Sequence, residues 1–330
     1  MFSKTTIRGI QFEPARFLAP LAGITHSAFR RLVAEFGGCG ALWTEMLSAR
    51  QILREDRHAS PWLRRRPVEK RVIYQLMIRD TDALEPIIGR LSEIGPDGLD
   101  INLACHAPAI RQLDAGSRLY MDREALAPVL REVRRCWPGL LTVKIRLGHE
   151  ADGWQTTFAE RMKLFEDSGV DAVVLHPRFF EDKFKRRARH ELLAWVASLS
   201  RLPLIASGDI TGEASVRERA AQLQPAGAVM VGRMAAAQPW VFAAWDRPLS
   251  VNHAEVWRRL LDYTCEDFPP EKAIGRIKVF TKYYARNFKF GHDFATSVQN
   301  APDLAALRGR ADAFFARSPV VDPEPTLSGI

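Results

Sequence analysis

Short apolar runs alternate with amphipathic stretches along most of the chain. The runs are rich in β-branched residues and predict strands, while stretches such as 26–37 and 156–169 have the apolar spacing of helices. The expected strands are 16–21, 40–46, 71–77, 97–103, 141–146, 171–176, 203–207 and 227–231. Eight strand-then-helix units in succession predict an α/β fold, a parallel (β/α)8 TIM barrel. A doubly wound sheet is the alternative, but no G-x-G-x-x-G motif follows the first strand.

The pattern changes after the eighth unit, where residues 274–289 have a helical periodicity. One side of this helix would be apolar, with Ile277, Phe280, Tyr284 and Phe288. The opposite side would carry four cations, Lys278, Lys282, Arg286 and Lys289. A merely solvated face is the alternative to phosphate contact, but solvated helices usually mix charges of both signs. We therefore expect a barrel domain over residues 1–245, a small all-helical RNA-binding domain over 246–318, and a disordered proline-rich tail over 319–330.

Charge adds a polyanionic partner to this picture. The 330 residues carry a net charge of +8, and basic residues cluster at 64–71, 183–189 and 272–289. Such clusters attract polyanions because each phosphate that they neutralise releases counterions. Solvated surface charge explains any one cluster equally well, whereas the three together favour a nucleic acid.

Composition also narrows the setting of the protein. No apolar run approaches the roughly 20 residues that span a bilayer, and the amino terminus lacks the apolar centre of a secretory signal. The cysteines Cys39, Cys105, Cys136 and Cys265 stand singly, without the spacing of a zinc site or a disulfide framework. We expect a cytoplasmic, monomeric protein with no metal and no membrane association.

Polar or conformationally special residues end every expected strand. They are Pro20, Glu45, Gln75, Asn102, Lys144, Arg146, His176, Arg178, Ser207, Gly208, Gly232 and Arg233. The carboxyl ends of barrel strands meet at one face, where barrel enzymes build their sites. The series therefore predicts a ligand pocket at that face.

Lys144 and Arg146 suggest the nature of the ligand. They lie two positions apart in an expected strand and so share the face that points into the barrel. A buried cation needs an anion or an electron-rich ligand, and reduced flavin meets that need. A salt bridge to Glu45 or Asp100 is the alternative. His176 alone fits a ring contact, a proton relay or a core histidine.

Gly208, Gly232 and Arg233 favour a phosphate site after the seventh and eighth strands. Glycines there let backbone N–H groups approach an anion, and an arginine meets a phosphate with two parallel hydrogen bonds. Tight turns alone would also explain the two glycines. The segment INLACHAP, residues 101–108, adds a reactive side chain at the same face. Taken alone, Cys105 is open to four roles: nucleophile, metal ligand, proton donor or small buried side chain.

The motifs together resemble those of the tRNA-dihydrouridine synthase family. They are LAPLAGITHSAFRRL, WTEM, DINLAC, AGSRLYMD, TVKIRLG, VVLHPR, IASGDI and VMVGRMAAAQPWVF, which occur in the family's order over about residues 16–245. The later segment GRIKVFTKYYARNF is similar to the family's helical RNA-binding domain.

The resemblance implies an FMN-bound barrel that uses NADPH to reduce the C5=C6 bond of uridines in tRNA. It assigns Cys105 as the proton donor to C5 while hydride from FMN reaches C6, a role that suits a thiol with a reference pKa near about 8.5. The implied cofactor contacts are Pro20, Leu21, Ala22, Gln75, Lys144, His176, Ser207, Gly208, Asp209, Gly232 and Arg233. The implied substrate contacts are Asn102, Arg146, Arg178, Lys278, Lys282, Arg286 and Lys289.

Three departures indicate a divergent member of the family. The family usually reads Gly-Cys-Pro where this chain has Ala104, Cys105 and His106, and it has glycine and asparagine where this chain has Pro177 and Ser207. His106 would either raise the thiolate fraction of Cys105 or contact an RNA phosphate. Two other functions stay open: an FMN-dependent reductase of a small molecule, and a non-catalytic RNA-binding descendant without flavin.

Overall fold

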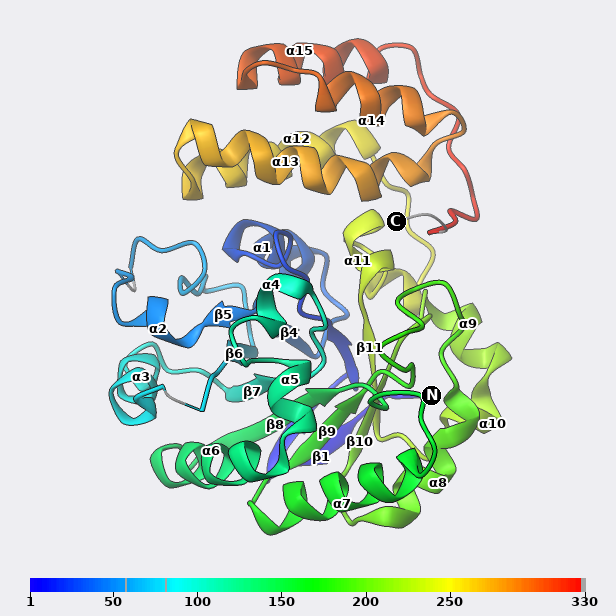
Figure 1. The fold of residues 1–330 in the computed structure, drawn as a ribbon. Helices are drawn as coiled ribbons and strands as arrows, with labels where there is room; N and C mark the ends of the chain where they lie inside the picture. Colours follow the sequence, from blue (N-terminus) through cyan, green and yellow to red (C-terminus); the bar gives the residue numbers. More distant parts are fainter. Residues whose placement is uncertain (57, 81, 328–330) are drawn as a thin grey trace.

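Within residues 1–56, 58–80 and 82–327, which the computed structural model describes, eight parallel strands close into a barrel (Figure 1). Their order is β4-β3-β11-β10-β9-β8-β7-β6, and β6 pairs back with β4. The barrel strands are β3 (Arg16–Leu18), β4 (Ala41–Trp43), β6 (Val72–Met77), β7 (Gly98–Asn102), β8 (Leu140–Ile145), β9 (Ala172–Leu175), β10 (Leu204–Ser207) and β11 (Ala228–Val231). The predicted (β/α)8 barrel is confirmed. A two-residue strand, β5 (Leu47–Ser48), pairs in parallel with the last two residues of β6.

Helices cover the outside of the barrel, as Figure 1 shows. They are α1 (Ser27–Phe36), α2 (Ala49–Ile52), α3 (Leu84–Ser92), α4 (Pro108–Arg111), α5 (Ser117–Met121), α6 (Arg123–Cys136), α7 (Trp154–Asp167), α8 (Leu193–Leu199), α9 (Glu213–Glu218), α10 (Ala220–Leu223) and α11 (Arg233–Ala237), with 3₁₀ turns η1 (His190–Leu192) and η2 (Ala243–Trp245). The apolar spacing in α1 and α7 explains their packing, because Phe29, Leu32 and Val33 of α1 and Phe158 and Phe165 of α7 are buried.

Alternate side chains of the strands fill the barrel in two zones. Toward the amino ends the interior is apolar, with Phe17, Trp43, Ile73, Leu140, Val174, Ile205 and Met230 in one buried cluster. Since strand side chains alternate with a period of two, the same inward face continues toward the carboxyl ends. There it presents Gln75, Lys144, His176 and Ser207. A polar layer therefore lies on an apolar floor.

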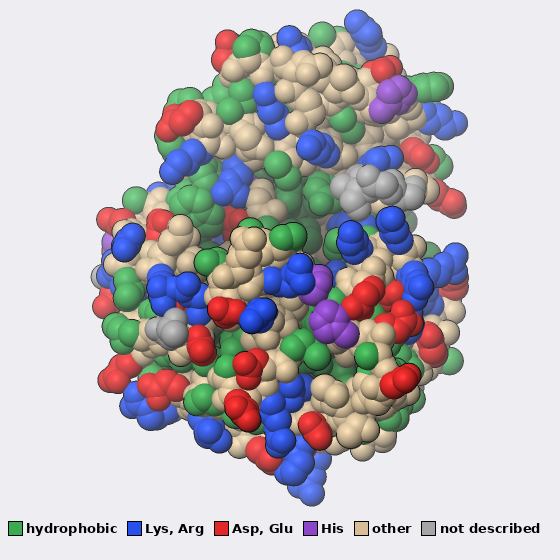
Figure 2. Space-filling view, viewed as in Figure 1, with side chains coloured by type: hydrophobic (Ala, Val, Ile, Leu, Met, Phe, Trp, Pro, Cys, Tyr) green, Lys and Arg blue, Asp and Glu red, His purple; other side chains and the backbone are tan. Residues whose placement is uncertain are grey.

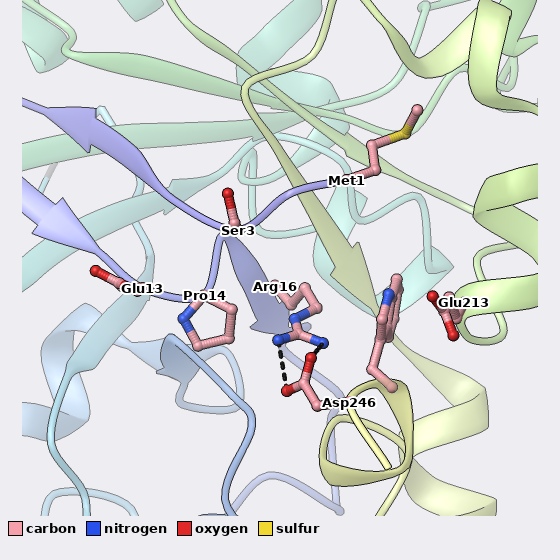
Figure 3. Close-up of a pocket in the computed structure, with 8 residues that line it drawn as sticks. Met1, Ser3, Glu13, Pro14, Arg16, Glu213 and Asp246 are labelled. Atoms are coloured by element: carbon pink, nitrogen blue, oxygen red, sulfur yellow. Dashed lines mark hydrogen bonds and ion pairs between the residues drawn. The ribbon is translucent and has the colours of Figure 1, made fainter. Parts of the chain in front are cut away.

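An amino-terminal hairpin, which the sequence pattern did not predict, closes the other end of the barrel. Its strands are β1 (Thr5–Ile7) and β2 (Ile10–Phe12), and Phe12 packs edge-on against Phe17 at 5.3 Å. Near this end the two terminal nitrogens of Arg16 donate to Asp246, at 3.0 and 2.8 Å, within a cavity of about 380 Å³ (Figure 3). Arg16 begins β3, so this cavity lies at the face opposite the polar layer, where contacts in barrel folds serve stability rather than catalysis.

Four further helices form a bundle beside the barrel. They are α12 (His253–Asp267), α13 (Pro270–Tyr284), α14 (Gly291–Gln299) and α15 (Leu304–Phe315), with η3 (Ala285–Asn287) after α13. In Figure 1, α12 and α13 lie across α1 and α11. Helix α12 contacts α1, and α13 contacts α11. The last turn of the barrel part, η2, ends at Trp245, before the predicted boundary at 245/246. Every helix of the described residues is too short or too polar to cross a lipid bilayer.

The predicted helix over 274–289 is shorter at its end than its periodicity suggests. The α-helix stops at Tyr284, a 3₁₀ turn follows, and Phe288 is extended. The expected apolar residues are nevertheless buried, and Lys282, Arg286 and Lys289 are exposed. Lys278 differs from the prediction, because its ammonium donates to the Ala301 carbonyl at 2.6 Å inside the bundle.

The tail is also more ordered than expected over part of its length. Lys289 N–H donates to the Val320 carbonyl at 2.9 Å, and Asp322 N–H donates to the Asn287 carbonyl at 2.7 Å. Residues 320–322 are therefore held against the bundle. Of the tail expected to be disordered, residues 328–330 lie outside the described residues.

The bundle is attached to the barrel at both ends of α13. Before α13, the buried carboxylate of Asp267 accepts hydrogen bonds from Arg64 (2.6 Å), Arg66 and Ser27. After α13, the side-chain amide of Asn287 donates to the Ala237 carbonyl at 2.7 Å, at the end of α11. The Arg64 and Arg66 contacts revise the interpretation of the basic cluster 64–71. Both of these arginines bind a carboxylate of the protein itself.

We expect Asp267→Ala to destabilise the protein by about 3 kcal/mol, because it leaves two partly buried guanidinium groups without their carboxylate. Asp262, on the same helix, pairs with Arg308 at the surface with 55% of its side chain exposed, so Asp262→Ala should cost only about 0.5 kcal/mol. Urea unfolding of both variants measures the difference. Equal losses would show that the Asp267 contacts contribute no more than a surface pair.

Candidate active site

The polar layer is organised around one carboxylate, that of Asp100 in β7. Gln75 Nε2 donates to Asp100 Oδ2 at 2.7 Å, and Thr142 Oγ1 donates to Oδ1 at 2.5 Å. Burial raises the Asp100 pKa to about 6, and the hydrogen bonds from Thr142 and Gln75 oppose that rise. The sequence suggested Asp100 only as a possible salt-bridge partner of Lys144. Its bonds instead orient Gln75 of the neighbouring strand.

The same chain of hydrogen bonds reaches the Cys105 loop. Asn102 Nδ2 donates to Gln75 Oε1 at 2.8 Å, and Asn102 Oδ1 accepts the backbone N–H groups of Ala104 (3.2 Å) and Cys105 (3.0 Å). The Asn102 amide therefore fixes the backbone that carries the thiol. One of its two N–H donors remains for another partner.

Gly116 completes the support of Cys105 from the other side of the loop. Its φ of +59° lies in the left-handed region, and a Cβ there would come within 2.7 Å of the Cys105 carbonyl oxygen. The next residue, Ser117, donates its N–H to that carbonyl at 2.9 Å. Only glycine lets the chain return this closely. The segment 105–117 is thus a loop tied at its base.

Lys144 lies opposite Asn102 in the register of β7 and β8. Its ammonium has no hydrogen-bond or ion-pair partner among the described residues, so the alternative of a salt bridge to Glu45 or Asp100 is wrong. Burial and the nearby Arg146 lower the Lys144 pKa to about 8, while Asp100 and Cys105 act in the opposite direction. A half-buried amine without such a partner is typical of a site that awaits a ligand.

His176 is held in one neutral form by the group beside it. Arg178 Nη1 lies 2.6 Å from His176 Nε2, and an arginine can only donate, so Nε2 is the acceptor and the ring proton is on Nδ1. Burial, followed by the charges of Lys144 and Arg146, keeps the His176 pKa well below its ordinary value. Gly208 packs on this ring, because a Cβ there would be 2.5 Å from Cδ2.

Arg178, expected as a substrate contact, and Asp209, expected as a cofactor contact, form an ion pair in which Arg178 is buried and Asp209 is half-buried. Arg178 Nη2 donates to both carboxylate oxygens of Asp209, at 2.7 and 2.6 Å, and Arg178 is 2% exposed. Asp209 also accepts the N–H of Ala188 at 2.8 Å. The pair positions His176 and anchors the basic loop 183–189 over the strand ends.

That loop brings an aromatic side chain to the site which the sequence analysis did not single out. The Phe184 ring lies under the guanidinium groups of Arg233 and Arg146, 4.5 and 5.4 Å from its centre, and 6.2 Å from the His176 ring. Its side chain is 51% exposed. An apolar ring within a basic run, KFKRRAR, was the only sequence signal for it.

The remaining predicted cofactor residues surround the same opening. Pro20 and Leu21 are half-buried and Ala22 is exposed in the loop after β3, and Ser207 is buried at the end of β10. Gly232 follows β11, and a Cβ there would lie 3.6 Å from Ala19 and 3.8 Å from Leu21, which places this loop next to it. Arg233 lies 3.6 Å from Asp209. The polar carboxyl ends of six strands thus converge at one face of the barrel.

His106 makes contacts other than the one with Cys105 that the sequence suggested. Its ring stacks on Phe180, with centres 4.7 Å apart, and its Nδ1 lies 3.0 Å from Ser117 Oγ. Burial lowers the pKa of His106, and Arg111 and His149 act in the same direction. No hydrogen bond joins His106 to Cys105 in the part of the chain that the structure describes.

Comparison with known proteins identifies this arrangement. The family described as dihydrouridine synthase (Dus) matches residues 17–293, which cover the barrel from the second residue of β3 onward and the first two helices of the bundle. The chain belongs to the dihydrouridine synthase family. Similar proteins include tRNA-dihydrouridine synthase B of Escherichia coli K12, 31% identical over 310 residues, covering 90% of this chain and 94% of that protein. The homologue from Pseudomonas aeruginosa is 26% identical over 309 residues, covering 91% and 92%.

Solved structures support the fold of this dihydrouridine synthase family member independently. TcOYE, determined with pHBA, superposes with a TM-score of 0.53 at 12% identity, covering 78% of this chain and 95% of that chain. An old yellow enzyme homologue from Zymomonas mobilis gives 0.52 at 13% identity, covering 72% and 90%. At these identities the likeness concerns the barrel fold alone.

The lowered pKa of Lys144 predicts a pH-dependent stability. Because its folded-state pKa is about 8 against the ordinary 10.5, the protonated ammonium destabilises the folded protein below pH 8. This penalty is released as the pH rises from about 8 toward 10.5. We expect the unfolding free energy of the wild type, relative to Lys144→Met, to increase by about 2 kcal/mol between pH 7 and pH 9.5.

Urea unfolding at the two pH values measures this difference. Lys163 is 74% exposed and pairs with Asp167 on the outer helix α7, so Lys163→Met serves as the matched control. If the difference in unfolding free energy between wild type and Lys144→Met is the same at both pH values, burial does not destabilise the protonated ammonium.

Proposed function

We propose that this protein is an FMN-dependent tRNA-dihydrouridine synthase that uses NADPH to reduce the C5=C6 bond of uridines in tRNA. Family membership supports the reaction class, and the polar layer supports the flavin. The observation that carries the proposal is the ammonium of the half-buried Lys144, which has no hydrogen-bond or ion-pair partner among the described residues. Lys144 shares its register position with Asn102, three residues before Cys105.

The residues around the opening fit an isoalloxazine ring and a phosphate. Lys144 offers a cation to the electron-rich edge of a flavin, and the Asp100 bond orients the Gln75 amide beside it. His176 offers a donor at Nδ1, since its Nε2 is occupied by Arg178. Gly208, Gly232 and Arg233 line the side where barrel folds commonly bind phosphate, and Phe184 adds an aromatic surface.

When bound, FMN would take a hydride from NADPH and supply it to C6 of the uracil. The chain's own part is to place a proton at C5 and to hold the base. Cys105 is the residue positioned for the proton, since Asn102 and Gly116 hold its backbone from two sides. The remaining Asn102 donor would bind a uracil oxygen. Arg146, 9% exposed and bound to the carbonyls of Phe179 and Lys183 at 3.3 Å, would add positive charge nearby.

The hollow between barrel and bundle suits entry of an RNA (Figure 2). The side of α13 toward the barrel carries Arg276, whose Nη1 lies 3.4 Å from Glu45. The guanidinium of Arg276 and the ammonium of Lys272 both lie over the Trp62 ring, at 5.6 and 6.0 Å. We therefore place RNA contacts on this side of α13 as well as on the exposed Lys282, Arg286 and Lys289.

The first test is the visible absorption of the purified protein before and after anaerobic NADPH. We expect a flavin spectrum that bleaches, and dihydrouridine in tRNA incubated with the reduced protein. Cys105→Ala should keep the spectrum and its bleaching but lower the rate of dihydrouridine formation by about 10²- to 10⁴-fold, because only the proton donor is removed. Mass spectrometry of digested tRNA measures the rate.

Cys265→Ala is the matched control, since Cys265 is exposed on α12 in the bundle. A colourless protein that does not take up FMN would favour the non-catalytic RNA-binding descendant. A bleaching flavin that reduces a free pyrimidine but no tRNA would favour the small-molecule reductase. Equal rates for Cys105→Ala and the wild type would remove Cys105 from the reaction.

A further inference from the structure

A basic groove lies beside the Cys105 loop. It is on the barrel itself and separate from the hollow between barrel and bundle. It has a volume of about 780 Å³ and is formed by α4, α5, the start of α6 and the loop at 148–150. Its lining includes the cations Arg111, Arg118, Arg123 and Arg161 and the imidazoles of His106 and His149, against one carboxylate, Asp122. Figure 2 shows basic and histidine side chains gathered on the barrel below the hollow.

Two of these cations have no side-chain partner among the described residues. Arg111 and Arg123 are exposed, and their guanidinium groups make no hydrogen bond or ion pair there. Their neighbours are engaged: Arg118 pairs with Asp114 at 2.6 Å, and Arg161 donates to the carbonyls of Tyr120 and Met121 at 2.8 and 2.7 Å. Arg111 comes from α4 and Arg123 from α6. Unpaired positive charge therefore lies on two separate walls of the groove.

The groove shares a wall with the loop that carries the thiol. His106 follows Cys105 directly, and Ser117, which also lines the groove, binds both the Cys105 carbonyl through its N–H (2.9 Å) and the His106 ring through its Oγ (3.0 Å). The His149 ring stands edge-on to the His106 ring at 5.6 Å and binds Glu181. A ligand in the groove would therefore lie next to whatever reaches Cys105.

We propose that this groove binds the phosphodiester groups of the RNA strand that flank the target uridine. The inference rests on the proposed function, because a base that reaches Cys105 must carry its own backbone to the rim beside it. Cations on two walls suit successive phosphates of a strand better than the single convergent site that one phosphate monoester needs. His106, which stands where the family usually has proline, adds an imidazole to this wall.

The test compares Arg111→Ala/Arg123→Ala with Arg201→Ala/Arg247→Ala in the flavin-loaded protein. Arg201 and Arg247 are also exposed and unpaired among the described residues, but they lie toward the amino ends of the strands, before β10 and beside Asp246. Binding of a fluorescein-labelled, unmodified tRNA transcript is measured by anisotropy at several salt concentrations. Each phosphate contact contributes about 0.7 to 0.9 to the slope of log K against log salt.

We expect the Arg111/Arg123 variant to bind the transcript at least tenfold more weakly and to lose about 1.5 from that slope, while the control pair changes neither. Unchanged affinity and slope would overturn the proposal. If the variant instead slows flavin bleaching by NADPH and binds tRNA normally, the groove serves the phosphate of NADPH and the proposal fails. A wild type that binds tRNA but forms no dihydrouridine would refute the proposed function, and the slopes would still decide whether the groove binds RNA.

Discussion

The buried carboxylate of Asp100 is the interaction on which the candidate site depends. It accepts from Gln75 and Thr142, Gln75 accepts from Asn102, and Asn102 accepts the N–H groups that position Cys105. Three strands and one loop are thereby held in one register by a single group. Such a network in a low-dielectric interior is costly to break, because the loss of one member leaves the next one unsatisfied.

Much of this arrangement follows from the period of two in the strands. Once eight strands and their direction are predicted, every second residue must point inward, and the polar ones near the carboxyl ends must meet. The placement of Gln75, Lys144 and His176 in one layer could therefore be predicted from the sequence. Their partners could not, because whether Lys144 lies near a carboxylate depends on side-chain directions across neighbouring strands.

Charged residues show most clearly where sequence reasoning ends. A run such as 64–71 looks the same whether its arginines face solvent or bind a buried carboxylate 200 positions away, as Arg64 binds Asp267. Arg178 and Lys278 are further cases, since the first binds Asp209 and the second binds the Ala301 carbonyl. The hairpin β1–β2 escaped prediction for a related reason: three-residue strands carry too little pattern, and packing on Phe17 determines them.

The attachment of α13 at both ends has a mechanical consequence. Asp267 and Asn287 lie just outside the two ends of α13, whose 15 residues span about 22 Å. The bundle therefore cannot rotate about one of these contacts without breaking the other. Under the proposed function, the shape change that brings a base from a folded RNA to the barrel would fall mainly on the nucleic acid, and selection among RNAs would follow how readily each one deforms.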